Sequence, residues 1–268
     1  MQNLPDSDKA QTHPRYKPCL TLSDNKVPYV IWFEDALHYH GVPTAVFDLY
    51  LLVLDIEIAA DCLIKAGWAL DESPHRIGMA DVTTPQVSLL AEHNKSITVD
   101  ENPFLKPTRT VLLPASDWKF PLVADPPLER VQQLPFPPLS GLLDALIESW
   151  LDGPTGNEKS LHHLAVQLGY LYGHAPALKE KSFAEQMKYE HRQFHFDVLA
   201  GMELGTVPFR KHQRSIRDAL LQGRYEFQEC SASRDKEDLF DNWSKIRLPD
   251  AVHADVHADD SEEPCDLK

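Results

Sequence analysis

Three acidic side chains near the start of the chain could share one site. Glu34 and Asp35 are adjacent, and Asp48 follows within an apolar run. Together they predict an acidic pocket that favours a cation or an amine, or that supplies a general acid or base of raised pKa. Two plainer interpretations stay open. Asp48 could be a carboxylate satisfied by backbone hydrogen bonds, and Glu34 and Asp35 could be the N-terminal acids of a short helix.

Tyr50 follows Asp48 at the spacing that places two strand side chains on one face. One carboxylate with a phenol is a poor Mg²⁺ site, because Mg²⁺ prefers hard oxygen ligands. Asp48, Glu34, Asp35 and Tyr50 are therefore the candidate catalytic residues, and Asp48 is a metal ligand only if the protein is active with Mg²⁺.

A second group of polar residues lies around residues 190–197. His191 and His195 are four apart and share a helix face, so they could bind zinc if a third ligand comes from elsewhere. The HExxH motif is absent because Arg192 follows His191. A buried hydrogen-bonding network is the favoured alternative. His191, Arg192 and His195 are nevertheless candidate ligand-binding residues, as is His38.

A third group is basic. Arg210, Arg214 and Arg217 recur at helical spacing, with Lys211 and His212 beside them. Such a cluster predicts a site for an anion or an acidic ligand, with Arg210 and Arg214 as binding residues. The alternative is a set of salt bridges to the chain's own carboxylates.

The elements that must position these residues differ between the two halves of the chain. In the first half we expect strands at 27–33, 42–53, 87–90 and 110–113, with helices at 34–40 and from Asp55 to a stop at Gly67. In the second half we expect helices at 139–150, 161–171, 176–202 and 208–228. We divide the chain into a flexible arm (1–24), an α/β domain (25–125), a Pro-rich linker (126–138), a helical domain (139–246) and an acidic disordered tail (247–268).

Composition narrows the function classes. Apolar residues make up 43% and charged residues 25%, as in ordinary globular proteins. The net charge of −15 argues against a nucleic-acid partner. We find no signal peptide and no apolar run long enough to span a membrane. The four cysteines form no CxxC pair, which favours reduced thiols and a cytoplasmic location.

The segment from Trp32 to Val53 reads WFEDALHYHGVPTAVFDLYLLV. Its Ala-Leu and His-Gly pairs, its Asp48 strand and the helix ending in Gly67-Trp68 resemble the nucleotidyltransferase-fold superfamily, in its antibiotic-modifying and minimal-nucleotidyltransferase branch. We also note a resemblance to fungal proteins with this pattern. The resemblance implies a nucleotidyltransferase-like α/β (α+β) domain with a mixed sheet, followed by a mostly α-helical domain, with the ligand in the cleft between them.

The same resemblance shows what this chain lacks. The family holds divalent metal with two carboxylates on the second strand, and here Tyr50 takes the second place. The family's phosphate-approaching glycine pair is replaced by Phe33 and Glu34. Asp117 is a candidate for the family's third carboxylate, although a loop or capping role is favoured.

These observations predict a protein that has lost Mg-dependent nucleotide transfer and binds a small molecule or a partner in an acidic cleft, with no cofactor. One alternative is an active nucleotidyltransferase that uses Mg²⁺ and a nucleotide. Another is a metal-free acid–base enzyme of the cyclase or isomerase type in a fungal small-molecule pathway. The sequence names no protein partner.

Overall fold

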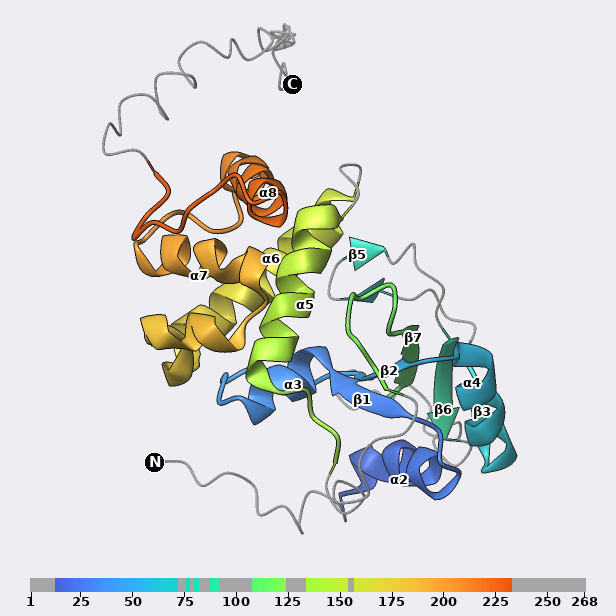
Figure 1. Cartoon of the computed structure of the whole chain (residues 1–268). Helices are drawn as coiled ribbons and strands as arrows, with labels where there is room; N and C mark the ends of the chain where they lie inside the picture. The colour runs from blue at the N-terminus through green and yellow to red at the C-terminus, as the bar shows by residue number, and fades with distance from the viewer. Residues whose placement is uncertain are drawn as a thin grey trace, which may run out of the picture. The chain divides into compact units, whose positions relative to one another are not determined.

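One five-stranded mixed sheet organises the first half of the chain (Figure 1). The computed structural model describes residues 13–71, 76–77, 80–81, 87–91, 108–123, 134–153 and 157–232. All elements named here lie in one compact unit that ends at Ser231. The strands, in spatial order, are β1 (Tyr29–Trp32), β2 (Leu49–Val53), β7 (Thr110–Pro114), β6 (Val87–Ala91) and β3 (Trp68–Leu70). Only β2 and β7 of these neighbours run parallel.

Alternation along the strands sends side chains into two hydrophobic clusters. On one face, Ile31, Leu51 and Leu112 pack with residues of helices α2 (Lys17–Asp24) and α4 (Ile56–Lys65). On the other face, Trp32, Tyr50, Leu52 and Leu113 join helices α3 (Phe33–Tyr39), α5 (Leu139–Asp152) and α6 (Glu158–His174). The sheet is therefore covered on both sides, which explains why its central strands β2 and β7 are mostly apolar.

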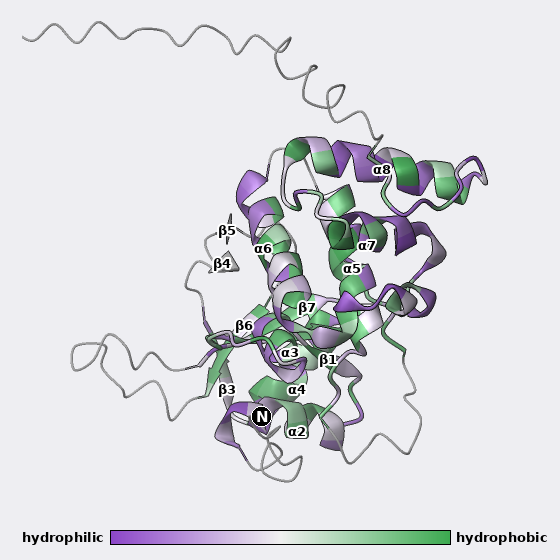
Figure 2. Cartoon of the chain, turned by 90° about the vertical axis from the view of Figure 1, so that its left-hand side faces the viewer, coloured by the Kyte–Doolittle hydropathy of each residue, from purple (hydrophilic) through white to green (hydrophobic). Residues whose placement is uncertain are grey.

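The remaining elements are mostly helical. A short strand pair, β4 (Arg76–Ile77) with β5 (Ala80–Asp81), stands apart from the main sheet. Figure 2 shows green, hydrophobic central strands, whereas α8 alternates between purple and green. The other helices are η1 (Pro14–Tyr16), η4 (Pro176–Lys179), η5 (Lys181–Gln186), η6 (Tyr189–His191), α7 (Arg192–Leu199) and α8 (Val207–Leu221).

Helix α4 begins and ends at the residues that the sequence indicates. The Asp55 side chain accepts hydrogen bonds from the backbone N–H groups of Glu57 and Ile58, at 2.9 and 3.0 Å. These bonds satisfy two donors that the first helical turn leaves open. Gly67 follows the helix with a φ of 97°, a conformation that side-chain-bearing residues rarely adopt.

Several predicted elements need correction. The strand expected over 42–53 begins only at Leu49, after Pro43, which has no N–H to donate to a ladder. Residues 14–24, expected as part of a flexible arm, form η1 and α2, whose Cys19 and Leu22 are fully buried. The helix expected over 176–202 is three 3-10 turns followed by α7, and the helix expected over 208–228 ends at Leu221, before Gly223. The short strand β3 was not predicted.

Parts of the predicted segments lie outside the described residues. They include residues 1–12 of the arm, 126–133 of the linker, 233–246 of the helical domain and the tail 247–268. The described end of the linker contacts the core. Leu134 and Phe136 pack against buried residues, and the carbonyl oxygen of Pro135 accepts a hydrogen bond from the N–H of Ile31 at 2.9 Å. This proline-rich stretch therefore adds a backbone contact beside β1.

Candidate functional site

The turn between β1 and α3 places two of the candidate acids. Phe33 begins α3 with a φ of 51°, which costs roughly 1–2 kcal/mol for a residue with a side chain. Its ring is fully buried and lies 4.8 Å from the Trp118 ring and 5.2 Å from the Tyr50 ring, centroid to centroid. These contacts hold the strained turn, which sets Glu34 and Asp35 in the first turn of α3.

Asp35 forms a buried ion pair that the sequence did not reveal. The residue is 2% exposed, and its two carboxylate oxygens accept hydrogen bonds from Arg15 Nε at 2.8 Å and Nη2 at 2.6 Å. The Tyr16 hydroxyl donates a third bond at 2.9 Å. Arg15 also donates to the carbonyl oxygens of Phe47 and Asp48. The N-terminal helix η1 thus fastens α3 to the segment that enters β2.

Asp48 is bound by a second arginine. One carboxylate oxygen accepts from Arg109 Nε and Nη2 at 3.1 and 2.8 Å, and the other accepts from the Arg109 backbone N–H at 3.3 Å. Arg109 also lies 3.5 Å from a carboxylate oxygen of Asp71. The parallel pairing of β2 with β7 brings Asp48 and Arg109 together, because both residues lie immediately before their strands.

Glu34 is the candidate acid that these arginines leave without an ion pair. Its Oε2 atom is buried and has no hydrogen-bond partner within the described residues. Burial raises the pKa of Glu34 to about 7, and the nearby carboxylates of Asp35 and Asp48 act in the same direction. Burial, followed by the charges of Glu34 and Asp48, also raises the pKa of Tyr50. A carboxyl group that titrates near neutral pH can donate or accept a proton.

The structure therefore gathers the predicted catalytic residues and adds cations to them. Glu34, Asp35, Asp48 and Tyr50 influence one another electrostatically, and the guanidinium groups of Arg15 and Arg109 lie among them. Three carboxyl groups thus share their surroundings with two fixed positive charges. This group of side chains is much less negative than its acids alone would make it.

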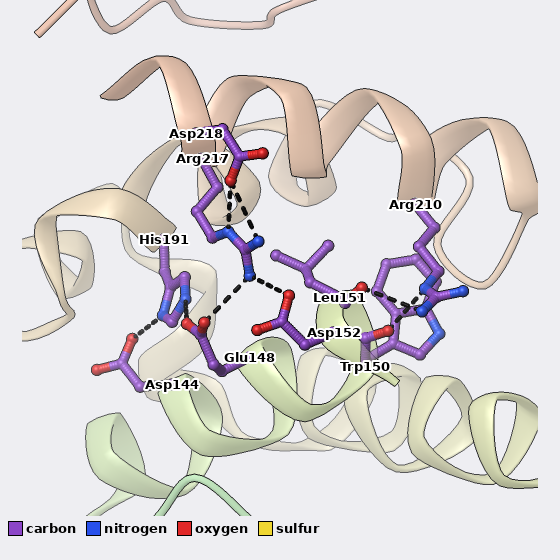
Figure 3. Close-up of polar contacts among 9 residues, drawn as sticks. All are labelled: Asp144, Glu148, Trp150, Leu151, Asp152, His191, Arg210, Arg217 and Asp218. Atoms are coloured by element: carbon purple, nitrogen blue, oxygen red, sulfur yellow. Dashed lines mark hydrogen bonds and ion pairs between the residues drawn. The ribbon is translucent and has the colours of Figure 1, made fainter. Parts of the chain in front are cut away.

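A second polar network joins the helices of the second half (Figure 3). His191 is fully buried, with Nδ1 2.8 Å from Asp144 Oδ1 and Nε2 2.6 Å from Glu148 Oε2. Arg217, from α8, donates to Glu148 Oε1 at 3.1 Å and to Asp152 at 2.8 Å. Burial lowers the pKa of His191, but the hydrogen bonds to Asp144 and Glu148 and the charges of these two acids together outweigh it and raise the pKa. The network ties α5 to η6 and α8.

The other predicted ligand-binding residues are placed apart. His195 does not join His191, because its ring nitrogens lie 3.1 Å from the Tyr172 hydroxyl and 3.2 Å from the Glu180 carbonyl oxygen. The Arg192 guanidinium lies over the Tyr189 ring. His38 is exposed on α3. Helical spacing of the two histidines therefore did not lead to a shared site.

The three arginines of α8 also separate. Arg210 donates to the carbonyl oxygens of Trp150, Leu151 and Gly153, which lie at the C-terminal end of α5 (Figure 3). This contact satisfies carbonyls that the helix cannot bond itself and places a cation at the negative end of its dipole. Arg217 binds carboxylates of the chain, and Arg214 is exposed.

Sequence reasoning missed Arg15, Arg109 and the acids of α5. A signal for the acids was present: Asp144, Glu148 and Asp152 repeat every fourth residue and therefore line one side of the helix. No comparable signal pointed to Arg15 or Arg109.

The comparisons with known proteins leave the family open. No protein-family model matches the chain, and no curated protein matches its sequence. The fold class is α+β, with a five-stranded mixed sheet and many helices. Among the residues that the structure describes, no helix is long and apolar enough to cross a bilayer.

Proposed function

We propose that this chain is a nucleotidyltransferase-fold protein that has lost Mg-dependent nucleotide transfer and binds a small molecule beside Glu34. The strand–helix–strand order of β1, α3 and β2, with Asp48 immediately before β2, supports the fold part of this proposal. The helices that follow the sheet are also in keeping with the resemblance. Fold alone does not define function, so the proposal depends on the site.

The observation that carries the loss of nucleotide transfer is the pair of arginine contacts. Arg15 occupies both carboxylate oxygens of Asp35, and Arg109 contacts both carboxylate oxygens of Asp48. A divalent ion bound there would have to displace a guanidinium group or lie beside one. Mg²⁺ dehydrates reluctantly and needs carboxylates that are free to ligate it.

The ligand that this site favours carries an amine or another hydrogen-bond donor. Glu34 is the acid whose Oε2 atom lacks a hydrogen-bond partner in the described part of the chain. A protonated amine near this carboxyl would stabilise its charged form and satisfy the buried oxygen. We therefore expect a small molecule that donates a hydrogen bond to this oxygen of Glu34 and places its apolar part against the apolar and aromatic side chains nearby.

The first prediction concerns nucleotides. We expect ATP, CTP, GTP and UTP to leave the melting temperature unchanged, each with and without Mg²⁺, in a thermal-shift measurement. A ligand at a hundredfold excess over its Kd stabilises the folded state by about 2.7 kcal/mol, which such an experiment resolves easily. A Mg-dependent shift with any nucleotide, absent in Asp48→Asn, would make the protein an active transferase and overturn the proposal.

The amine preference can be tested in the same format. A library of small amines and their neutral analogues should yield compounds that stabilise the native chain and lose that effect in Glu34→Gln. Glu57→Gln, which alters an exposed acid on α4, is the matched control. If a compound stabilised the native chain, Glu34→Gln and Glu57→Gln equally, it would bind at a site other than the one beside Glu34.

The raised pKa of Glu34 favours a second function, metal-free acid–base catalysis. A general acid or base works best when its pKa lies near the operating pH, and Glu34 meets that condition. Any amine that binds in a Glu34-dependent way should therefore be incubated with the protein and followed by mass spectrometry. Chemical conversion by the native chain but not by Glu34→Gln would identify an enzyme, whereas an unchanged compound would identify a binding protein.

A further inference from the structure

The His191 network contains a group of atoms suited to a metal ion. One ring nitrogen of His191 and one carboxylate oxygen each from Glu148 and Glu190 all lie within 4.8 Å of one another. His191 is fully buried, and the two glutamates are partly exposed at the edge of the network. One imidazole and two carboxylates are ligands that first-row divalent ions accept.

The ring of His191 is held in the orientation that a metal ligand needs. Asp144 Oδ1 lies 2.8 Å from His191 Nδ1. The other carboxylate oxygen of Asp144 accepts a hydrogen bond from the backbone N–H of Lys188 at 3.0 Å. With Asp144 accepting from Nδ1–H, Nε2 faces Glu148 (Figure 3). A carboxylate behind a histidine in this way fixes the tautomer and makes the other nitrogen a better ligand.

Arg217 does not compete for the oxygen that would bind the ion. It contacts Glu148 through Oε1 at 3.1 Å, whereas Glu148 Oε2 faces His191 at 2.6 Å. A metal ion that takes Nε2 and Oε2 would replace the hydrogen bond between these two atoms and leave the Arg217 contact in place. Arg217 then acts as a positioning residue for the glutamate.

The charges around the group favour an added cation. The fixed cationic side chains that act on Glu148 are Arg217 and Lys188. The carboxylates of the same network are Asp144, Glu148, Asp152, Glu190 and Asp218. The acids outnumber the fixed cations, so a divalent ion would offset part of the excess negative charge.

We propose that His191, Glu148 and Glu190 bind one divalent transition-metal ion, with Zn²⁺ as the preferred ion and Asp144 as the residue that orients His191. Imidazole favours Zn²⁺ over Mg²⁺, which prefers oxygen ligands and bound water. Three protein ligands leave one position of a four-coordinate zinc ion to water. This site is separate from the one at Glu34.

The test is a metal titration of the full chain after treatment with a chelator. Zn²⁺ in competition with a chromophoric chelator should show one tight site per chain, and Co²⁺ should give the visible absorption bands of a low-symmetry site. Loss of an outer-shell partner typically weakens metal binding 10–100-fold, so Asp144→Asn should fall in that range and Glu190→Gln should fall at least tenfold.

Glu190→Gln is the central variant, because Glu190 is partly exposed and its replacement is compatible with folding, whereas a change at buried His191 risks the fold. Glu185→Gln, an exposed acid in the neighbouring η5, is the control and should bind as the native chain does. Thermal melts in chelator should show Glu190→Gln folded as well as the native chain. Absence of a tight site, or a site that Glu190→Gln and Glu148→Gln leave unchanged, would overturn the proposal.

Discussion

Replacing Arg15 with alanine is expected to lower the free energy of unfolding by about 3–5 kcal/mol, the usual cost of removing one partner of a buried ion pair. Asp35 is 2% exposed, and among the described residues the substitution leaves the Tyr16 hydroxyl as the side chain that still donates a hydrogen bond to its carboxylate. The carbonyl oxygens of Phe47 and Asp48 would lose their donors as well. Together these losses make this the largest expected effect of a single change at the site.

The measurement is urea denaturation followed by circular dichroism, with Lys17→Ala as the control. Lys17 carries the same charge two residues later but is exposed, so its loss should change stability very little. Arg15→Lys should fall between the two, because an ammonium group cannot make the two-pronged contact with Asp35. Similar losses for Arg15→Ala and Lys17→Ala would show that the Asp35 pair contributes nothing.

Glu34→Gln should make the protein more stable at neutral and alkaline pH. In the folded chain the pKa of Glu34 is about 7, raised from an ordinary value of 4.5 by burial. Between these two values the folded state binds more protons than the unfolded state, so the free energy of unfolding falls as the pH rises. Over this pH range the ionisation of Glu34 lowers the free energy of unfolding by an amount on the order of 3 kcal/mol. A variant that cannot ionise at this position should not show this decrease.

The check is a series of urea titrations between pH 4 and pH 8 on the native chain and Glu34→Gln. The two proteins should have similar free energies of unfolding near pH 4. Above pH 4 the free energy of unfolding of Glu34→Gln should become the larger of the two. Glu57→Gln should follow the native chain throughout, because Glu57 is exposed. A constant difference between native chain and Glu34→Gln at every pH would mean that the substitution acts through packing and not through the charge of Glu34.

Local patterns were sufficient for much of the fold. Apolar runs predicted the strands at β1, β6 and β7 and the core of β2, and Asp55 and Gly67 marked the ends of α4. The pattern failed over 42–48, where apolar residues lie in a loop, and at β3, which is only three residues long. Proline content was misleading at residues 14–24, since Pro14 and Pro18 occupy first turns of helices, where proline is tolerated.

The candidate site was predictable in its acids and not in its cations. Glu34, Asp35 and Asp48 could be grouped because a strand, a short helix and a second strand follow one another directly. Their arginine partners come from other elements, Arg15 from an N-terminal turn and Arg109 from the residue before a strand that follows much later. Long-range pairs of this kind depend on tertiary packing, which a single sequence does not display.

The way α8 closes on α5 has a consequence for synthesis on the ribosome. Helix α5 leaves the ribosome with three acids on one side. The partner of Asp144 follows 47 residues later, and the two partners of Glu148 follow 43 and 69 residues later. Arg210, which donates hydrogen bonds to the carbonyl oxygens at the end of α5, is also part of α8. The N-terminal sheet can pair earlier, whereas the helical part must wait. We therefore expect nascent chains that are arrested before α8 emerges to be cleaved by protease between α5 and η6. Chains long enough for α8, with Arg217, to leave the ribosome should resist this cleavage.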